Sequence, residues 1–127
     1  LFIAQEAAAE LAKHGGSIVN IVDIHAERPL KGYPLYTVAK AGLAALTRAL
    51  ALELAPRVRV NGVSPGAIVW PDDGQFDDAE RARILASTPL SRVGVPEDVA
   101  QAVHFLACAP FVTGQLIAVD GGRSIFL

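Results

Sequence analysis

Two short runs of β-branched residues, separated by one long helical run, constrain the fold of this chain more than any other feature. The runs SIVNIVD (residues 17–23) and RVRVNGV (residues 57–63) are rich in Val and Ile, which favours strands. Between them, residues 36–55 place apolar side chains at helical spacing, contain no Pro and predict a long helix. A strand, a helix and a second strand make a crossover unit, which is the building block of parallel sheets.

Further segments extend this pattern toward both ends of the chain. They predict helices over residues 1–14, 77–86 and 96–108 and a strand, QLIAVD, over residues 115–120. The strands are nearly continuous in Ile and Val, which is typical of strands that are buried on both faces. The predicted fold class is therefore α/β, with one parallel sheet, helices on both of its faces and right-handed connections.

Composition excludes several kinds of partner. The chain has 127 residues, of which 52% are hydrophobic and 19% charged, and its net charge of −2 does not suit nucleic acid. No apolar run reaches the roughly 18 residues of a membrane span, and no basic segment precedes an apolar one, so a soluble, cytoplasmic protein is expected. The one cysteine, Cys108, lies in the apolar run VHFLACA and is predicted to be a small buried hydrophobe. No His, Cys and Asp cluster has metal-ligand spacing, so no metal is expected.

Tyr36 and Lys40 begin the long predicted helix and lie on one of its faces, one turn apart. A free tyrosine has a pKa near ~10, and a neighbouring ammonium favours the phenolate by about 1 to 3 units. We therefore expect Lys40 to lower the pKa of Tyr36. Ligands of parallel sheets bind beyond the carboxyl ends of the strands, where Asp23 and the turn SPGAIVW follow the first two strands. One crevice is expected to collect Asp23, Tyr36, Lys40 and residues 65–68.

Three motifs together resemble the short-chain dehydrogenase/reductases, enzymes with a nicotinamide-dinucleotide-binding fold. They are the pair Tyr36-x-x-x-Lys40, the turn RVNGVSPG and the segment VTGQLIAVDGG, which occur in the expected order and cover nearly the whole chain. Most members carry a serine thirteen residues before the tyrosine, and here that residue is Asp23. An aspartate in NIVDIHAERPLKGYPLYTVAK resembles the pteridine reductases, which reduce dihydropterins and folates. That match extends to Asp72 and Asp73.

The resemblance implies a Rossmann-like doubly wound sheet, of which residues 1–127 are the C-terminal catalytic half. The chain starts at Leu1 without an initiator methionine, in a predicted helix, so we expect it to be a piece of a longer protein. The Gly-rich phosphate turn of the family lies in the other half, and no G-x-G-x-x-G-like motif occurs here. The preference for NADPH over NADH is implied by the pteridine reductase resemblance alone.

The same resemblance assigns roles to individual residues. Tyr36 supplies a proton to the substrate, Lys40 tunes Tyr36 and binds the nicotinamide ribose, and Asp23 relays protons and anchors a pterin. Cofactor contacts are expected from Tyr36, Lys40, Ile21, Val22, Pro65, Gly66 and Ile68, and substrate contacts from Asp23, Tyr33, Ala67 and Trp70. The family usually has a Thr or Ser where Trp70 stands, so Ile68 or backbone groups are expected to take over its contact with the nicotinamide.

Structural alternatives stay open for several of these residues. Asp23 could cap a turn, Trp70 could be a core aromatic residue, and His25 near the strand end could be structural. The functional reading is an NADPH-dependent pterin or folate reductase. The alternatives are a carbonyl or 3-ketoacyl reductase of the same superfamily and a catalytically idle dinucleotide-binding scaffold. A homotetramer is expected, because superfamily members commonly associate through the two helices predicted here over residues 1–14 and 36–55.

Overall fold

The computed structural model describes residues 1–70, 74 and 76–125. Asp72 and Asp73 lie outside the described residues. The helices are α1 (Phe2–Lys13), α2 (Pro34–Leu54), α3 (Asp78–Ala86) and α4 (Pro96–Cys108), with short 3-10 helices η1 (Ile24–Ala26) and η2 (Arg123–Ile125). The strands are β1 (Ser17–Ile21), β2 (Arg59–Pro65) and β3 (Leu116–Val119). Each predicted helix and strand is present, with ends that differ by at most two residues.

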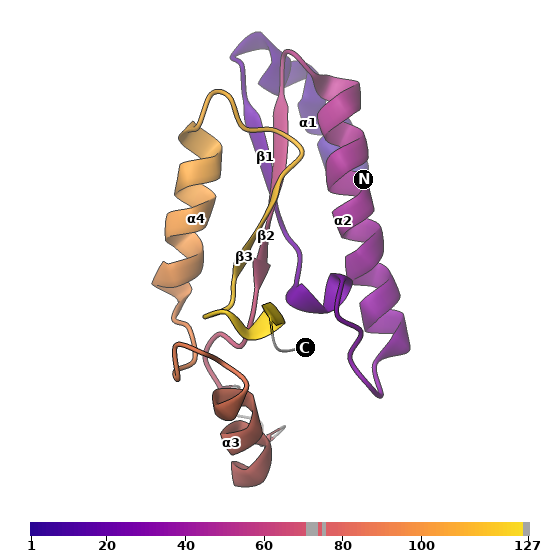
Figure 1. The fold of residues 1–127 in the computed structure, drawn as a ribbon. Helices are drawn as coiled ribbons and strands as arrows, with labels where there is room; N and C mark the ends of the chain where they lie inside the picture. The colour runs from indigo at the N-terminus through magenta and orange to yellow at the C-terminus, as the bar shows by residue number, and fades with distance from the viewer. Residues whose placement is uncertain (71–73, 75, 126–127) are drawn as a thin grey trace.

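The three strands form one parallel sheet in the order β1-β2-β3 (Figure 1). β1 pairs with β2 from Ser17 opposite Arg59 to Ile21 opposite Val63, and β2 pairs with β3 from Gly62 opposite Leu116 onward. All three carboxyl ends therefore lie at one edge of the sheet, where η1, the turn after Pro65 and η2 follow. The α/β class with a parallel sheet is confirmed.

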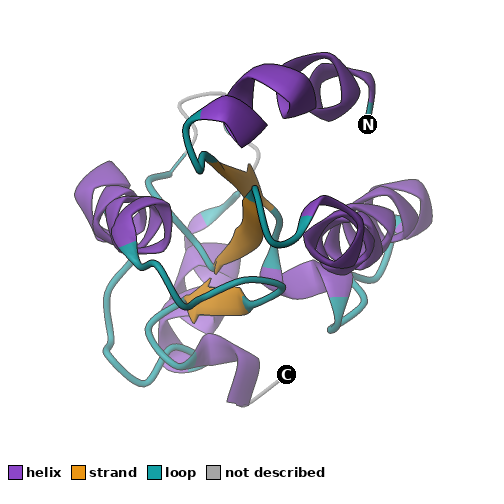
Figure 2. Ribbon diagram, turned by 90° about the horizontal axis from the view of Figure 1, so that it is seen from above, coloured by secondary structure: helices purple, strands orange, loops and turns teal. Residues whose placement is uncertain are grey.

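Helices cover both faces of the sheet. Seen along the strands, α2 lies on one face and α4 on the other, while α1 lies beside β1 (Figure 2). Both connections step in the same direction across the sheet, yet their helices lie on opposite faces, so the two crossovers have opposite hands. The prediction of right-handed connections throughout is therefore wrong for one of them. The second connection contains both α3 and α4, which gives the chain enough length to reach the other face.

The core on the α2 face is small and apolar. Ala51 of α2 packs with Val58 and Val60 of the adjoining strand region, and all three are at most 4% exposed. Leu11 of α1 packs against this cluster. On the other face, Arg59 ties α4 to the sheet, because its guanidinium donates hydrogen bonds to three carbonyl groups at the end of α4, those of Leu106, Ala107 and Ala109, at 2.7–2.8 Å. A cation at a helix C-terminus also complements the helix dipole.

Two sequence-based expectations about apolar residues do not hold. Cys108 is exposed rather than buried. It follows the fully buried Leu106 by two positions, which is about 200° around a helix, so it faces away from the sheet. Its Sγ lies 3.8 Å from His104 Nε2 on the same outward surface.

α2 is also long and apolar enough to pass a length-and-composition test for a membrane span, with a mean hydropathy of 1.2 in its best window. The expectation that no such segment exists fails by this measure, because Ala, Val and Leu also occupy the outward face, where Leu35, Val38 and Leu52 are 68–85% exposed. One such helix is weak evidence for a membrane, since the core helix of a soluble protein passes the same test.

Candidate active site

Asp23 and Tyr36 form a direct hydrogen-bonded pair at the carboxyl edge of the sheet. Asp23 follows β1 by two residues, and Tyr36 lies in the first turn of α2, where Pro34 begins the helix. The Tyr36 hydroxyl donates to Asp23 Oδ2 at 2.7 Å, and 40% of Tyr36 is exposed. The crossover thus brings a phenol and a carboxylate together at a surface that a substrate can reach.

The second oxygen of Asp23 has a structural role. Asp23 is the N-cap residue of η1, and its Oδ1 accepts a hydrogen bond from the His25 backbone N–H at 2.8 Å. Asp23 therefore does cap a turn, as the structural alternative predicted, but only with Oδ1, while Oδ2 accepts the hydrogen bond from Tyr36. His25 itself is turned toward Arg28, with Nδ1 2.7 Å from the Arg28 carbonyl oxygen, in agreement with a structural histidine.

The pKa of Tyr36 is raised to about 12. Partial burial is the largest cause, and the hydrogen bond to Asp23 and its negative charge follow. The sequence predicted the opposite direction, from the ammonium of Lys40. Lys40 Nζ lies 5.8 Å from the centroid of the Tyr36 ring, whereas the Asp23 carboxylate accepts a hydrogen bond from the hydroxyl, so burial together with Asp23 outweighs the ammonium. With this pKa, the Tyr36 phenol keeps its proton at neutral pH.

Lys40 lies one helical turn after Tyr36 and is anchored to the end of β1. Its Nζ donates to the backbone carbonyl of Ile21 at 3.1 Å. An ammonium has three N–H donors, so this bond leaves donors for a further ligand beside Tyr36. The ribose hydroxyl groups of a nicotinamide nucleotide suit such donors, and the residues present fit the nicotinamide end of a dinucleotide.

The turn after β2 is packed tightly against the segment that follows β3. A Cβ atom on Gly66 would lie only 2.8 Å from Cα and from Cβ of Asp120, so no other residue fits without movement. The Asp120 carboxylate accepts hydrogen bonds from the backbone N–H groups of Gly122 and Ser124 at 2.7–2.8 Å. The position of the Pro65 turn therefore depends on the Asp120 turn.

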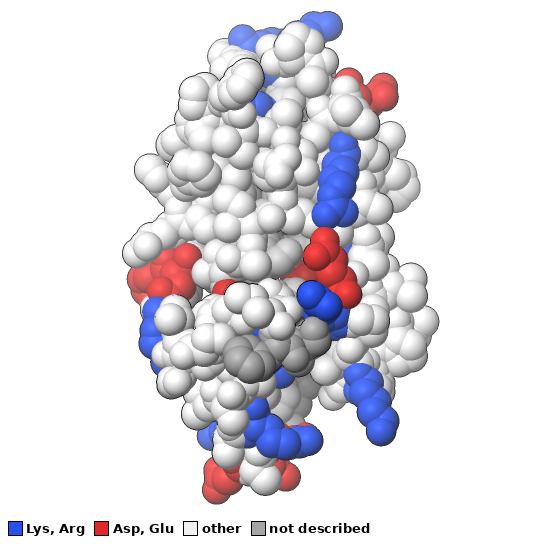
Figure 3. Space-filling view, viewed as in Figure 1, with Lys and Arg blue, Asp and Glu red and all other residues white. Residues whose placement is uncertain are grey.

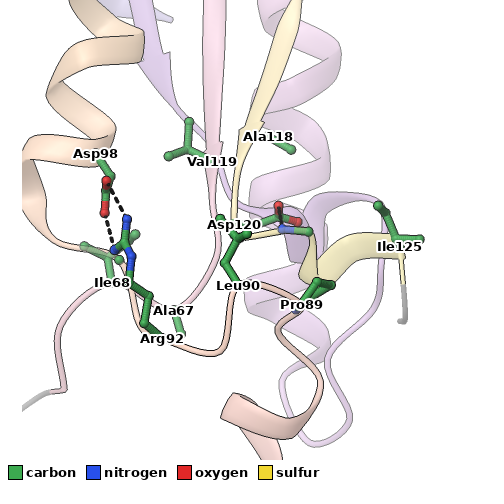
Figure 4. A pocket seen from close by; sticks show the side chains of 13 residues that line it. Ala67, Ile68, Pro89, Leu90, Arg92, Asp98, Ala118, Val119, Asp120 and Ile125 are labelled. Atoms are coloured by element: carbon green, nitrogen blue, oxygen red, sulfur yellow. Dashed lines mark hydrogen bonds and ion pairs between the residues drawn. The ribbon is translucent and has the colours of Figure 1, made fainter.

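A cavity of about 450 Å³ lies under this turn. Ala67, Ile68, Pro89, Leu90 and Ala118 are among its mostly apolar lining residues, and Arg92 and Asp98 form an ion pair on one side (Figure 4). Asp23, Tyr36 and Lys40 do not line it. The predicted site residues therefore fall into two groups. Asp23, Tyr36 and Lys40 form one group beside α2, and the turn after Pro65 with its cavity forms the other.

The remaining predicted residues differ in how well they are placed. Tyr33 is the N-cap residue of α2 and 48% exposed, and Ile21 is 46% exposed, so both are available to ligands. Val22 is 1% exposed and its N–H donates to the Val63 carbonyl, so it is part of the core at the end of β1. Trp70 packs against Phe76, with ring centroids 6.0 Å apart, and under the Arg81 guanidinium. Its contacts in this structure are thus with its own loop and α3.

Sequence reasoning missed the Arg92–Asp98 pair. Two hydrogen bonds of 2.7 and 3.0 Å join the guanidinium to the carboxylate, and Asp98 also accepts from the Val95 N–H at the start of α4. The Arg92 bonds, followed by the Val95 bond, lower the pKa of Asp98 to about 2. The acidic residues directly after Pro96 were the available signal, because an acid in the first turn of a helix is a cap candidate.

Comparison with known proteins gives a consistent picture. The family model described as enoyl-(acyl carrier protein) reductase matches residues 1–124. Pteridine reductase 1 of Leishmania tarentolae is 47% identical over 96% of this chain and 44% of its own length. The 3-oxoacyl-(acyl-carrier-protein) reductase of Thermotoga maritima is 40% identical over 91% of this chain and 48% of its own length.

The fold has close counterparts among solved structures. A short-chain type dehydrogenase/reductase from Mycobacterium ulcerans superposes with a TM-score of 0.92 at 35% identity, covering 98% of this chain and 48% of that one. This chain spans about half the length of the relatives it matches.

Proposed function

This chain belongs to the short-chain dehydrogenase/reductase family, and from that premise we propose that it is the catalytic half of an NADPH-dependent reductase of pterins or folates. The proposal joins residues 1–127 to an N-terminal dinucleotide-binding half, and we call the two together the complete enzyme. The observation that carries it is the 2.7 Å hydrogen bond from Tyr36 to an aspartate, Asp23, where most of the family has serine.

The chemistry follows from the protonated phenol. The bound dinucleotide would supply a hydride to a carbon of the substrate. Tyr36 gives its proton to the neighbouring atom, and Lys40 holds the ribose with the N–H groups that Ile21 leaves free. Pro65, Gly66 and Ile68 are proposed to contact the nicotinamide from the turn after β2. NADPH, rather than NADH, is proposed from the resemblance to pteridine reductase.

Asp23 supports a pterin rather than a simple ketone. A carboxylate can accept hydrogen bonds from the amino group and ring nitrogens of a pterin and can pass protons to them. The same charge disfavours a ketone, whose oxygen becomes negative as hydride arrives. Tyr33, Ala67 and Trp70 are proposed to complete the substrate pocket when substrate and cofactor are bound.

The test is a swap of Asp23 in the complete enzyme. We expect Asp23→Ser to lower turnover of dihydrobiopterin by about 10-fold or more, the scale of a lost charge-assisted contact of roughly 1.5 to 3 kcal/mol. Reduction of a diketone should stay equal or improve. Asp23→Asn is the matched control, because it keeps the shape and the η1 cap but removes the charge. Unchanged pterin turnover in Asp23→Ser, or a wild-type preference for the diketone, would refute the pterin assignment.

A second candidate is a carbonyl or 3-ketoacyl reductase. The 40% identity to a 3-oxoacyl-(acyl-carrier-protein) reductase favours it. On this reading Asp23 serves as the η1 cap and contributes little to substrate choice. The kinetics just described separate the two, because only the pterin reading couples the Asp23 charge to the preference between substrates.

We also propose that the complete enzyme is a cytoplasmic homotetramer that associates through α1 and α2. The support is the exposed apolar surface of both helices, where Phe2, Ile3, Leu35 and Leu52 are 80–87% exposed. Light scattering at micromolar concentration checks the assembly, and a monomer would contradict it.

A further inference from the structure

A second cavity, of about 220 Å³, begins at Asp23 and lies among η1, α2, β2, β3 and η2. Polar and charged side chains form much of its wall, namely those of Asp23, Glu27, Arg28, Arg48, Ser64, Gln115 and Ser124. In Figure 3 acidic and basic side chains gather on the surface over η1 and the adjoining part of α2. At about 30 Å³ for each water-sized group, the cavity has room for a charged group of several atoms.

The acidic groups of the cavity wall already have partners. Asp23 Oδ1 accepts a hydrogen bond from the His25 N–H at 2.8 Å, and Oδ2 accepts one from the Tyr36 hydroxyl at 2.7 Å. Glu27 Oε1 accepts from the Arg48 guanidinium at 3.1 Å, so these two opposite charges offset each other. A cationic ligand would therefore have to compete with bonds that the chain makes itself.

Two arginines supply donors without such partners. The Arg28 guanidinium lines the cavity and forms no ion pair with any residue that the structure describes. Arg123 directly precedes Ser124 of the wall, and its buried Nε has no hydrogen-bond partner in the described part of the chain. Partial burial is the largest influence on the pKa of Arg123 and lowers it, while the negative charges of Asp23 and Asp120 raise it. The charge of Arg123 is therefore within electrostatic reach of Asp23.

The groups that remain favour a ligand that accepts hydrogen bonds and carries negative charge. A guanidinium presents five N–H donors in a planar fork, which suits the two oxygens of a carboxylate. A buried donor without a partner costs free energy, and an acceptor that reaches Arg123 Nε recovers it. Ser124 and Gln115 lie in the same wall and can donate further hydrogen bonds.

We propose that Arg28 and Arg123 form a carboxylate-binding site at this cavity, and that the substrate carries the carboxylate. Asp23 contacts both the cavity and Tyr36, so a substrate whose reacting ring lies at Tyr36 can place an acidic side arm in the cavity. Acidic substrates are then preferred, such as a folate over a neutral pterin. The source of the carboxylate rests on the proposed reductase function, whereas the site itself does not depend on turnover.

The first experiment tests the site without turnover. Glutarate, a dicarboxylate, is titrated into the complete enzyme at constant ionic strength, and nuclear magnetic resonance follows the Arg123 Nε–H and the Ser124 backbone N–H. We expect millimolar binding that shifts both signals.

The double variant Arg28→Gln/Arg123→Gln should bind glutarate at least about 10-fold more weakly, the scale of one charge-assisted hydrogen bond. Arg28 is exposed, so Arg28→Gln alone provides the test if the double variant does not fold. Lys31→Gln is the matched control, because it removes a positive charge from the same loop but outside the cavity wall. No glutarate binding in wild type, or an equal loss in Lys31→Gln, would overturn the site.

The second experiment identifies the source of the carboxylate. In wild type we expect folate to bind about 10-fold more tightly than its dimethyl ester, which keeps the pterin and loses both charges. This ratio should approach one in the double variant and keep its wild-type value in Lys31→Gln. For a ketone reductase the matched pair is a keto acid and its methyl ester. A ratio of one in a wild-type enzyme that binds glutarate would assign the site to a free anion and overturn the substrate as the source.

The two experiments separate this inference from the proposed function. If the complete enzyme reduces neither pterins nor ketones, the proposed function fails, and the glutarate titration still decides the site. If it reduces them, but neither glutarate binding nor the ratio of acid to ester responds to the two arginines, the reductase stands and the carboxylate site is overturned.

Discussion

Gly66 offers a sharp test of how the active-site turn is held. A Cβ atom added at Gly66 would be 2.8 Å from two carbon atoms of Asp120, whereas carbon atoms pack best at about 3.5–4.0 Å. Gly66→Ala must therefore move the turn away from Asp120 by roughly 0.7–1.2 Å. One of the two atoms is the backbone Cα, so side-chain rotation alone cannot relieve the contact. The Gly66 N–H bond to the Val119 carbonyl, at 3.0 Å, resists the same movement.

The size of the effect follows from the cost of overpacking, about 1–3 kcal/mol. Unfolding entropy is about 2.1 cal/mol/K per residue, or roughly 0.27 kcal/mol/K for the 127 residues of this chain. We therefore expect Gly66→Ala to lower the Tm by roughly 4–11 °C. Thermal unfolding followed by circular dichroism measures this shift, and the unfolding free energy of the variant at the wild-type Tm gives the cost.

Gly42→Ala provides the control. Gly42 lies inside α2, and a Cβ there would meet no atom within 4 Å. The same substitution should raise stability by about 0.5–1 kcal/mol, because alanine is the better helix residue, and should raise the Tm by roughly 2–4 °C. Equal Tm values for Gly66→Ala and wild type would refute the claim that the Asp120 contact fixes the turn.

Three further outcomes are expected. In the complete enzyme Tyr36→Phe should lower turnover at least about 10²-fold with little change in cofactor affinity, whereas Lys40→Ala should impair both; near-normal turnover of Tyr36→Phe would exclude it as proton donor. Residues 1–127 alone should bind NADPH weakly in a titration, because the pyrophosphate rests on a Gly-rich turn that this sequence lacks, and low-micromolar binding would contradict that. The pKa of Asp98, about 2 in the folded chain and below its ordinary value of 3.8, means that its pairing stabilises the fold above pH 3.8 and that this stabilisation is lost as the pH falls through 2. Urea unfolding at pH 5 and at pH 2 should show that the free energy of unfolding falls less between these pH values in Asp98→Asn than in wild type.

The sequence predicted the elements of this fold because their signals are local. The β-branched runs and the long helix of residues 34–54 are set by side-chain spacing within each segment. The Asp23–Tyr36 contact could also be expected, since strand ends and the following helix starts meet at one edge of a parallel sheet.

The features that the sequence did not predict depend on contacts and orientations that exist only in the folded chain. The raised pKa of Tyr36 follows first from its partial burial and then from its hydrogen bond to Asp23 and the charge of that residue, and a four-residue spacing contains neither the burial nor the contact. The two crossovers have opposite hands because α4 packs on the face of the sheet opposite to α2. The exposure of Cys108 depends on the rotation of α4 about its axis. The cavity behind Asp23 is enclosed by segments far apart in sequence, so no single motif marks it.

The hydrogen bonds of Tyr36 and Lys40 join residues that lie close together in the sequence. Tyr36 reaches Asp23 across thirteen positions and Lys40 reaches Ile21 across nineteen, all within one strand, its 3-10 turn and the start of one helix. Contacts of such low sequence separation close small loops and form early in folding. The proposed catalytic group of Asp23, Tyr36 and Lys40 is therefore contained almost entirely in one segment of about twenty residues. Grafting residues 21–40 onto an unrelated parallel crossover of the same geometry would carry the phenol, carboxylate and ammonium along as a unit, while the turn held by Asp120 would have to be built anew.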